Sequence, residues 1–101
     1  MARLIYSGTA LADLDRLADF LLASDPVAAS QTVDLIADAV ETLRDHPLIG
    51  RPVEHGLREL IISRGRTGYV ALYSVEDSDD AVLILTVRHQ REAGYSDEQG
   101  P

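Results

Sequence analysis

The sequence predicts an α+β fold of order β-α-α-β-β-β, in which an N-terminal helical hairpin packs on one face of a small, mainly antiparallel sheet. Three observations predict it. The first half repeats apolar residues every three or four positions, as amphipathic helices do. The second half concentrates β-branched and apolar residues in short runs separated by turns, as strands do. The break Ser24-Asp25-Pro26 divides the helical half into two.

The first half is expected to hold one short strand and two helices. Residues 3–7 are rich in strand formers, and a helix is expected over about 9–23. Asp25 can cap a second helix and Pro26 can open it, because proline suits the first helical position. This second helix is expected to run to about residue 45. Since so short a turn joins them, the helices must pack antiparallel.

Each predicted helix has one apolar face, and a hairpin with an apolar side needs a sheet to cover. Acidic residues and Arg16 fall mostly on the opposite face of the first helix, and Phe20 is expected to pack in the core or at its edge. The apolar face of the first helix comprises Ala10, Leu11, Leu14, Leu17, Ala18 and Leu21, and that of the second comprises Ala29, Val33, Ile36, Val40 and Leu43. The residues on the opposite face of the first helix are Asp13, Asp15, Arg16 and Asp19.

Three strands are expected in the second half, over residues 58–63, 69–75 and 81–89. The turns at 64–68 and 76–80 are short, so these strands form an antiparallel meander. The last strand is apolar on both faces and is expected to lie in the middle of the sheet.

The second helix ends where His46-Pro47 begins a loop that continues through Gly50-Arg51-Pro52 to about Leu57. Arg51 is expected to hydrogen-bond the carbonyls at the end of the helix and so fix this loop. A metal site at His46 and His55 is not favoured, because no third ligand accompanies them.

Length and composition predict a single domain over residues 1–95 followed by a disordered polar tail at 96–101. The chain has 101 residues and a net charge of −8, and all nine basic residues are arginine. Residues 1–50 carry three arginines and eight carboxylates, whereas residues 51–75 carry four arginines and two glutamates. An acidic protein is repelled by nucleic acid at long range, so any such contact must be local.

The chain has no cysteine, which excludes disulfides and thiolate metal sites and favours a reducing compartment. No apolar run approaches the roughly 20 residues that a membrane helix needs. We therefore expect a cytoplasmic protein with no membrane partner, and nothing in the sequence indicates a cofactor.

An ordered set of short pieces over about residues 3–91 resembles the RelE/ParE toxin superfamily. Together they carry P-x-x-G-R-P before R-E-L and a last strand that ends in R-H-x-R. The pieces are Tyr6-Ser7 with Ala10, Leu14 and Leu17; Ala28-Ala29; Leu43-Arg44-Asp45-His46-Pro47; Gly50-Arg51-Pro52; Leu57-Arg58-Glu59-Leu60; Tyr69; Leu72-Tyr73-Ser74-Val75; and Val82 to Arg91.

The resemblance implies the toxin of a type II toxin–antitoxin pair, with a cognate antitoxin as partner. RelE-like toxins cut mRNA on the ribosome, and ParE-like toxins inhibit DNA gyrase. The ParE-like activity is favoured, because the absence of lysine and the acidic charge do not suit ribosome binding, so catalysis by this chain is not expected. A third alternative is a binding module or co-repressor that has lost toxicity.

If the chain is a nuclease, its candidates gather late in the sequence. His89 would act as acid or base, arginines would hold a phosphate, and Tyr95 lies close behind. The alternative is that His89 finishes its strand while the arginines are solvated or pair with Glu54, Glu59 and Glu92. The candidate arginines are Arg64, Arg66, Arg88 and Arg91.

Apolar residues beside the main helical stripes are candidates for an antitoxin-binding groove. These are Val27, Leu35 and Leu48. Tyr69 and Tyr73 share one face of their strand, and packing toward the core or the helices is expected for one of them.

Overall fold

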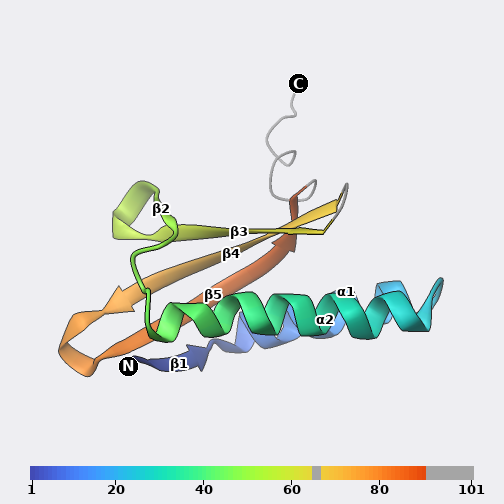
Figure 1. Cartoon of the computed structure of the whole chain (residues 1–101), viewed down its shortest axis with the longest axis horizontal. Coiled ribbons are helices and arrows are strands. Elements are labelled where there is room, and N and C mark those ends of the chain that lie inside the picture. The colour runs from blue at the N-terminus through green and yellow to red at the C-terminus, as the bar shows by residue number, and fades with distance from the viewer. Residues whose placement is uncertain (65–66, 91–101) are drawn as a thin grey trace.

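A computed structural model describes residues 1–64 and 67–90 of the chain (Figure 1). The predicted α+β architecture is confirmed, with one short strand that the sequence did not predict, formed by Arg51 and Pro52. The helices are α1 (Gly8–Leu22) and α2 (Pro26–Glu41); the strands are β1 (Arg3–Tyr6), β2 (Arg51–Pro52), β3 (Arg58–Arg64), β4 (Thr67–Glu76) and β5 (Ala81–His89); the 3-10 turns are η1 (Thr42–Arg44), η2 (Glu54–Gly56) and η3 (Asp77–Asp79).

The five strands form one sheet of order β1-β5-β4-β3-β2. β1 pairs with β5 in parallel, and every other pair is antiparallel. Figure 1 shows the two helices side by side along one face of this sheet. The final strand therefore lies inside the sheet, as its two-sided apolar character predicts.

The core lies between the helical hairpin and the face of the sheet that it covers. Both tyrosines expected on one face of β4 are buried there, Tyr69 and Tyr73. The largest fully buried side chains are Tyr73, Ile36, Leu43, Ile84, Val40, Val82, Val87 and Thr32.

A register shift in the centre of the sheet keeps β5 aligned with this core. Leu72 pairs with Thr86 and Tyr73 pairs with Ile84, which leaves Leu85 as an extra residue in β5. A β-bulge of this kind reverses the alternation of side chains beyond it. Both halves of β5 therefore direct apolar side chains toward the helices.

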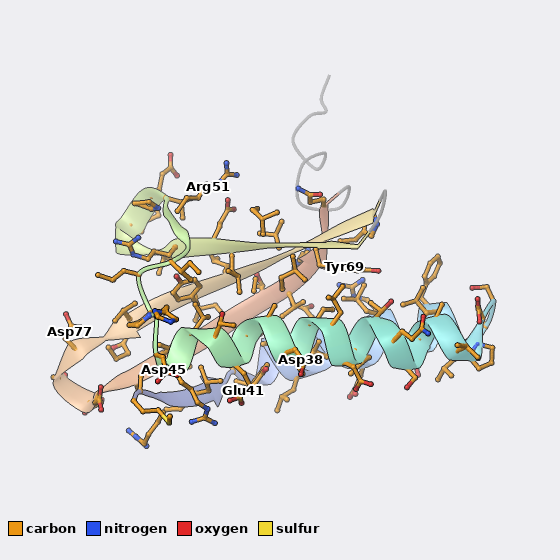
Figure 2. The ribbon with its side chains drawn as sticks, viewed as in Figure 1. Asp38, Glu41, Asp45, Arg51, Tyr69 and Asp77 are labelled. Carbon is orange, nitrogen blue, oxygen red and sulfur yellow. The ribbon has the colours of Figure 1, made fainter. Side chains whose placement is uncertain are left out.

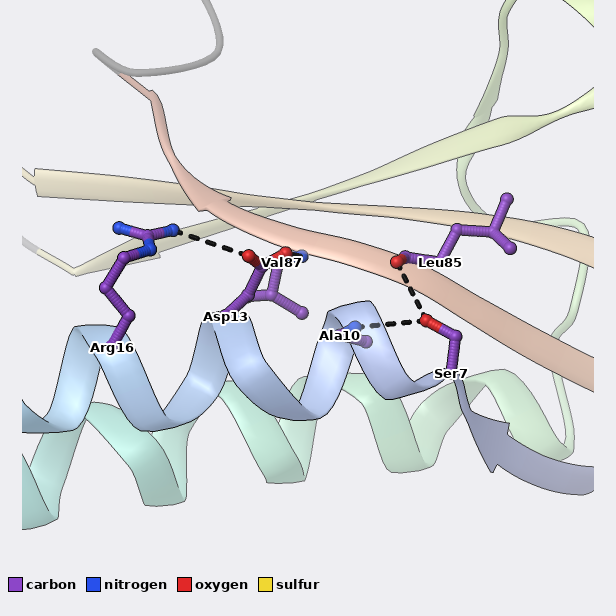
Figure 3. Close-up of polar contacts among 6 residues, drawn as sticks. All are labelled: Ser7, Ala10, Asp13, Arg16, Leu85 and Val87. Atoms are coloured by element: carbon purple, nitrogen blue, oxygen red, sulfur yellow. Dashed lines mark hydrogen bonds and ion pairs between the residues drawn. The ribbon is translucent and has the colours of Figure 1, made fainter.

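Ser7 closes the start of α1 and joins it to β5 (Figure 3). Its Oγ accepts a hydrogen bond from the amide of Ala10 at 3.0 Å, the usual contact of an N-cap. The same hydroxyl donates to the carbonyl of Leu85 at 2.9 Å. The pairing of β1 with β5 stops at Tyr6. The Ser7 hydroxyl therefore supplies a hydrogen-bond partner for β5 directly beyond the last residue of β1.

Asp13 is buried, although its place in the sequence predicted the exposed face of α1. Its Oδ2 accepts a hydrogen bond from the amide of Val87 at 3.0 Å, and Arg16 lies 3.6 Å from its Oδ1. Beyond β1 the edge of β5 would otherwise leave this amide without a strand partner, and an unsatisfied buried N–H is costly. The carboxylate therefore replaces a strand at this point (Figure 3).

Phe20 does not pack in the core as predicted, since 73% of its surface is exposed. Figure 1 shows the closed end of the helical hairpin projecting past the ends of the strands. A residue near the end of α1 therefore has no sheet to cover. Within the described part of the chain, no helix combines the length and apolar character needed to cross a membrane.

Candidate functional site

The end of the sheet where β5 finishes holds the histidine predicted as an acid or base. His89 is partly buried and opposes Tyr69 in the strand register. The two rings meet edge to face, with centroids 5.3 Å apart and planes at 87°. Tyr69 belongs to the core cluster, so His89 lies on the face of the sheet that the helices cover.

Arg88 is exposed and lies on the opposite face, because neighbouring residues of a strand alternate. The structure therefore does not bring Arg88 and His89 together. Arg64 ends β3 and opposes Thr67. Arg66, Arg91 and Tyr95 lie outside the described residues, so their part in a nuclease site stays a prediction.

The face of the sheet turned away from the helices, hereafter the outer face, is largely apolar at its centre. Ile61 stands on it with 41% of its surface exposed, and Ile5 is similarly exposed. The register aligns the outer face in three rows: Ile5, Leu83 and Ser74; Thr86, Leu72 and Glu59; and Arg88, Val70 and Ile61.

Tyr73 holds the loop that follows the helices. Its hydroxyl accepts a hydrogen bond from the amide of Gly50 at 2.9 Å and donates one to the carbonyl of Pro47 at 2.8 Å. Burial raises the pKa of Tyr73 above 10.0, while the Gly50 amide and Arg58 oppose the rise. A Cβ on Gly50 would lie 2.5 Å from the Tyr73 hydroxyl and 2.7 Å from the Glu59 carbonyl, so only glycine fits.

Arg58, and not Arg51, fixes the loop, and it does so through carbonyls of the loop itself and not of the helix end. Its Nη1 donates to the carbonyls of Leu48 at 3.1 Å and Gly50 at 2.7 Å. Arg51 instead binds Glu59 Oε1 through Nε at 3.0 Å and Nη2 at 2.9 Å. The prediction was wrong because Arg51 belongs to β2, where it opposes Glu59 and not the helix end.

The loop thus held presents two large apolar side chains to solvent. Leu48 is 63% exposed and Ile49 is 58% exposed. They help to line an open pocket of about 580 Å³ together with Asp45, His46 and Pro47, hereafter the loop pocket. Exposed apolar side chains on a fixed backbone are typical of interaction surfaces.

The three residues predicted for antitoxin binding do not share one environment. Val27 is exposed in the first turn of α2, and Leu48 lies beyond its end, so the length of the helix separates them. Leu35 is partly buried and packs against the core. Only Leu48 belongs to a pocket that the structure defines.

Neither His46 nor His55 belongs to a set of three potential metal ligands among residues 1–64 and 67–90. His46 lines the loop pocket, whereas His55 lies in η2. His55 has a φ of 63°, a left-handed conformation that is uncommon for residues other than glycine.

Comparisons with known proteins identify the family. The family model of the ParE toxin of the type II toxin–antitoxin system parDE matches residues 4–94. The chain belongs to the ParE toxin family. It is accordingly a toxin of the RelE/ParE superfamily, as the sequence pattern predicted.

Individual relatives of the toxin carry both names of the superfamily. Toxin RelE3 of Caulobacter vibrioides is 41% identical over 80 residues, which covers 79% of the chain and 85% of that protein. Toxin RelE2 of the same organism is 33% identical over 88% of the chain and 96% of its own length. A structure of the chromosomal ParDE system from P. aeruginosa gives a TM-score of 0.75 at 28% identity, covering 88% of the chain and 96% of that one.

Two residues that build the toxin's loop were not predicted as a site. Tyr73 was expected only to pack, and Arg58 was noted only within the matching R-E-L piece. The available signal was the spacing of Pro47, Gly50 and Arg58. Arg58 begins β3, so its guanidinium meets the carbonyls of the loop once the loop turns back on the sheet. The same turn brings the Pro47 carbonyl and the Gly50 amide to the Tyr73 hydroxyl.

Proposed function

We propose that the toxin acts in the ParE-like manner, by binding a topoisomerase such as DNA gyrase, and that a cognate antitoxin neutralises it. The observation that carries the proposal is the separation of Arg88 and His89 on opposite faces of the sheet. A nuclease site that combines His89 as acid or base with Arg88 as phosphate ligand is therefore disfavoured. The outer face, in contrast, offers an apolar surface around Ile61 to which a protein could bind.

Cleavage of RNA by its 2′-hydroxyl needs a base, an acid and cations that stabilise the phosphate. On the described outer face Arg88 stands beside apolar side chains, and the neighbouring row contains a carboxylate, Glu59. Arg51 at the edge is engaged by this carboxylate. A net charge of −8 adds repulsion of phosphates, so these residues favour a protein target over RNA.

The comparisons support the same choice to a limited extent. The matching family model describes ParE toxins, and the ParDE structure shares the fold over most of the chain. A structure of the toxin–antitoxin complex RelBE2 from Mycobacterium tuberculosis is 28% identical to the chain with a TM-score of 0.57. Both of these similar structures come from toxin–antitoxin systems, which supports the expectation of a cognate antitoxin for this toxin.

The test is DNA supercoiling by purified gyrase in the presence of the purified toxin. We expect inhibition at micromolar toxin and its relief by the antitoxin encoded beside the toxin gene. The matched pair of variants is Ile61→Asp on the outer face and Ile49→Ser on the loop. Inhibition should be lost in the first and kept in the second. Unchanged supercoiling with the wild-type toxin would remove the gyrase proposal.

The second candidate is a ribosome-dependent mRNA endonuclease, which is favoured by the similarity to the Caulobacter toxins RelE3 and RelE2. Primer extension on translated mRNA after toxin induction would then show cuts within codons. Under this alternative, substitution of the predicted acid or base, His89→Gln, would abolish the cuts. Intact mRNA in growth-arrested cells would eliminate it.

Growth after induction without antitoxin addresses the remaining alternative, a binding module that has lost toxicity. Arrest is expected for a toxin of either activity. Normal growth with accumulation of folded protein would favour the binding module.

A further inference from the structure

The loop pocket lies at the end of an acidic surface on α2. Four exposed carboxylates follow one another along α2 and the η1 turn beyond it, at spacings of four, three and four residues. They are Asp34, Asp38 and Glu41 on α2, and Asp45 directly after η1. Figure 2 shows the labelled members Asp38, Glu41 and Asp45 succeeding one another toward the end of α2. Asp45 also lines the loop pocket, so the charged and apolar surfaces are continuous.

Little positive charge neutralises this surface. Within the described part of the chain, the only ion pair made by the four carboxylates joins Glu41 to Arg44 at 2.8 Å. The guanidinium of Arg58 donates its hydrogen bonds to the carbonyls of Leu48 and Gly50 and, among the described residues, forms no ion pair with these carboxylates. A binding partner at this place therefore meets two exposed apolar side chains flanked by uncompensated negative charge.

The loop gains no stability from exposing Leu48 and Ile49, yet its backbone is held by several hydrogen bonds. The amide of Ile49 donates to the carbonyl of His46 at 3.1 Å, and Tyr73 and Arg58 bind the groups on either side. A partner that binds this loop would not have to order it first. Pre-organised apolar anchors of this kind concentrate binding energy at interfaces.

We propose that the loop pocket and the acidic face of α2 together bind an amphipathic segment of the antitoxin that is basic on its flanks and apolar at its centre. The inference rests on the proposal that the toxin has a cognate antitoxin, and it is independent of the toxin's target. Apolar side chains of the segment contact Leu48 and Ile49 in the pocket. Its lysines or arginines lie opposite Asp38 and Asp45.

Charge selects this occupant over a second copy of the chain. A second copy carries the same net charge of −8 and would bring like charges together at an acidic face. An acidic segment is disfavoured for the same reason. Exposed opposite charges attract within about 10 Å at 0.1 M salt, which suits a segment lying along the helix.

The test measures the affinity of the full-length toxin for the antitoxin encoded in the same operon, by isothermal titration calorimetry. The double variant Leu48→Ser/Ile49→Ser should weaken binding at least about thirtyfold, as loss of an interface hot spot does. The charge-reversed variant Asp38→Lys/Asp45→Lys should weaken it about tenfold at 0.1 M salt and less at 0.5 M salt.

Matched controls change the same chemistry elsewhere. Asp15→Lys/Asp19→Lys alters the exposed face of α1 by the same charge, and Phe20→Ser removes an apolar side chain that is even more exposed than Leu48 and Ile49. Both variants should leave the affinity for the antitoxin within about twofold of the wild-type value. For the charge variant the reason is that interactions between exposed charges fade beyond a Debye length of about 10 Å. For Phe20→Ser the reason is that the side chain lies outside the loop pocket.

Each other outcome overturns the inference. Tighter binding by Asp38→Lys/Asp45→Lys would show that the segment is acidic, and unchanged binding by the loop variant would place it elsewhere. A toxin dimer in sedimentation that Ile49→Ser dissociates would assign the pocket to a second copy. If the wild-type toxin fails to bind the antitoxin at all, the proposed partner fails together with this inference.

Discussion

The outer face and the loop pocket, two exposed apolar surfaces of the toxin, differ in how their backbone is held. The outer face is part of a regular sheet, and Ile61 is exposed there because no helix covers that side. The loop pocket is irregular, and Leu48 and Ile49 are exposed there because Tyr73 and Arg58 fix a backbone that would otherwise turn freely. The backbone of an apolar surface on a loop therefore needs side-chain hydrogen bonds to hold it, whereas on a sheet the backbone hydrogen bonds between strands do this.

The surfaces also differ in the charge around them. Arg88 and the ion pair of Arg51 with Glu59 border the outer face, so its charges are mixed. Carboxylates border the loop pocket, where Asp45 follows Glu41 (Figure 2). We interpret this difference as a division of roles, with the outer face contacting the target and the loop pocket contacting the antitoxin.

The largest effect is expected from Gly50→Ala, which tests whether the loop needs its close contact with the sheet. A Cβ there meets the Tyr73 hydroxyl and the Glu59 backbone, so we expect a loss of about 3 kcal/mol in the free energy of unfolding. Urea denaturation measures it. Gly8→Ala is the control, because nothing lies within 4 Å of its Cβ, and its stability should not fall. Equal stabilities would show that the loop yields easily.

A smaller effect is expected from Tyr73→Phe, which removes both hydrogen bonds of the hydroxyl. The Gly50 amide and the Pro47 carbonyl lose their partner, and the expected loss is about 2 kcal/mol. Because the folded state raises the pKa of Tyr73, the stability that depends on its proton is complete below pH 10.0. It is lost as the pH rises through the folded-state pKa.

The variant should lack the part of the alkaline loss that depends on the Tyr73 proton, and its stability should change less between pH 8 and pH 11 than that of the wild type. Denaturation midpoints between pH 8 and pH 11 provide the comparison. If both proteins lose stability in parallel above pH 10, other groups cause the decline and the loop is not held by this phenol.

The smallest stability effect is expected from His89→Ala, which removes the edge-to-face contact with Tyr69. About 1 kcal/mol should be lost in thermal denaturation. Growth inhibition should persist, since His89 faces the helices and not the outer face. Loss of toxicity with retained folding would restore the histidine to the functional site and favour the nuclease alternative.

The sequence predicted the regular elements well and the compensating contacts poorly. The boundaries of β5 and the cap and first residue of α2, Asp25 and Pro26, are as expected, because periodicity and caps are local properties. The strand β2 was missed because it has only two residues, and its pairing with β3 depends on how the loop folds back.

Asp13 shows why the remainder could not be predicted. A carboxylate in a helix is expected to face water, and only the early end of β1 leaves a β5 amide for it to bind. Phe20 fails for the converse reason, because the helix is longer than the sheet it covers. For the candidate site, the sequence supplied the residues at the end of β5. Alternation along a strand already implies that Arg88 and His89 lie on opposite faces, once both are assigned to that strand.

The most direct measurement is a paired assay of toxicity and antitoxin binding for Ile61→Asp and for Leu48→Ser/Ile49→Ser, with folding verified by circular dichroism. We expect Ile61→Asp to relieve growth arrest while the antitoxin still binds. The loop variant should remain toxic but escape neutralisation. If both variants lose the same property, one surface serves both partners and the division of roles is wrong.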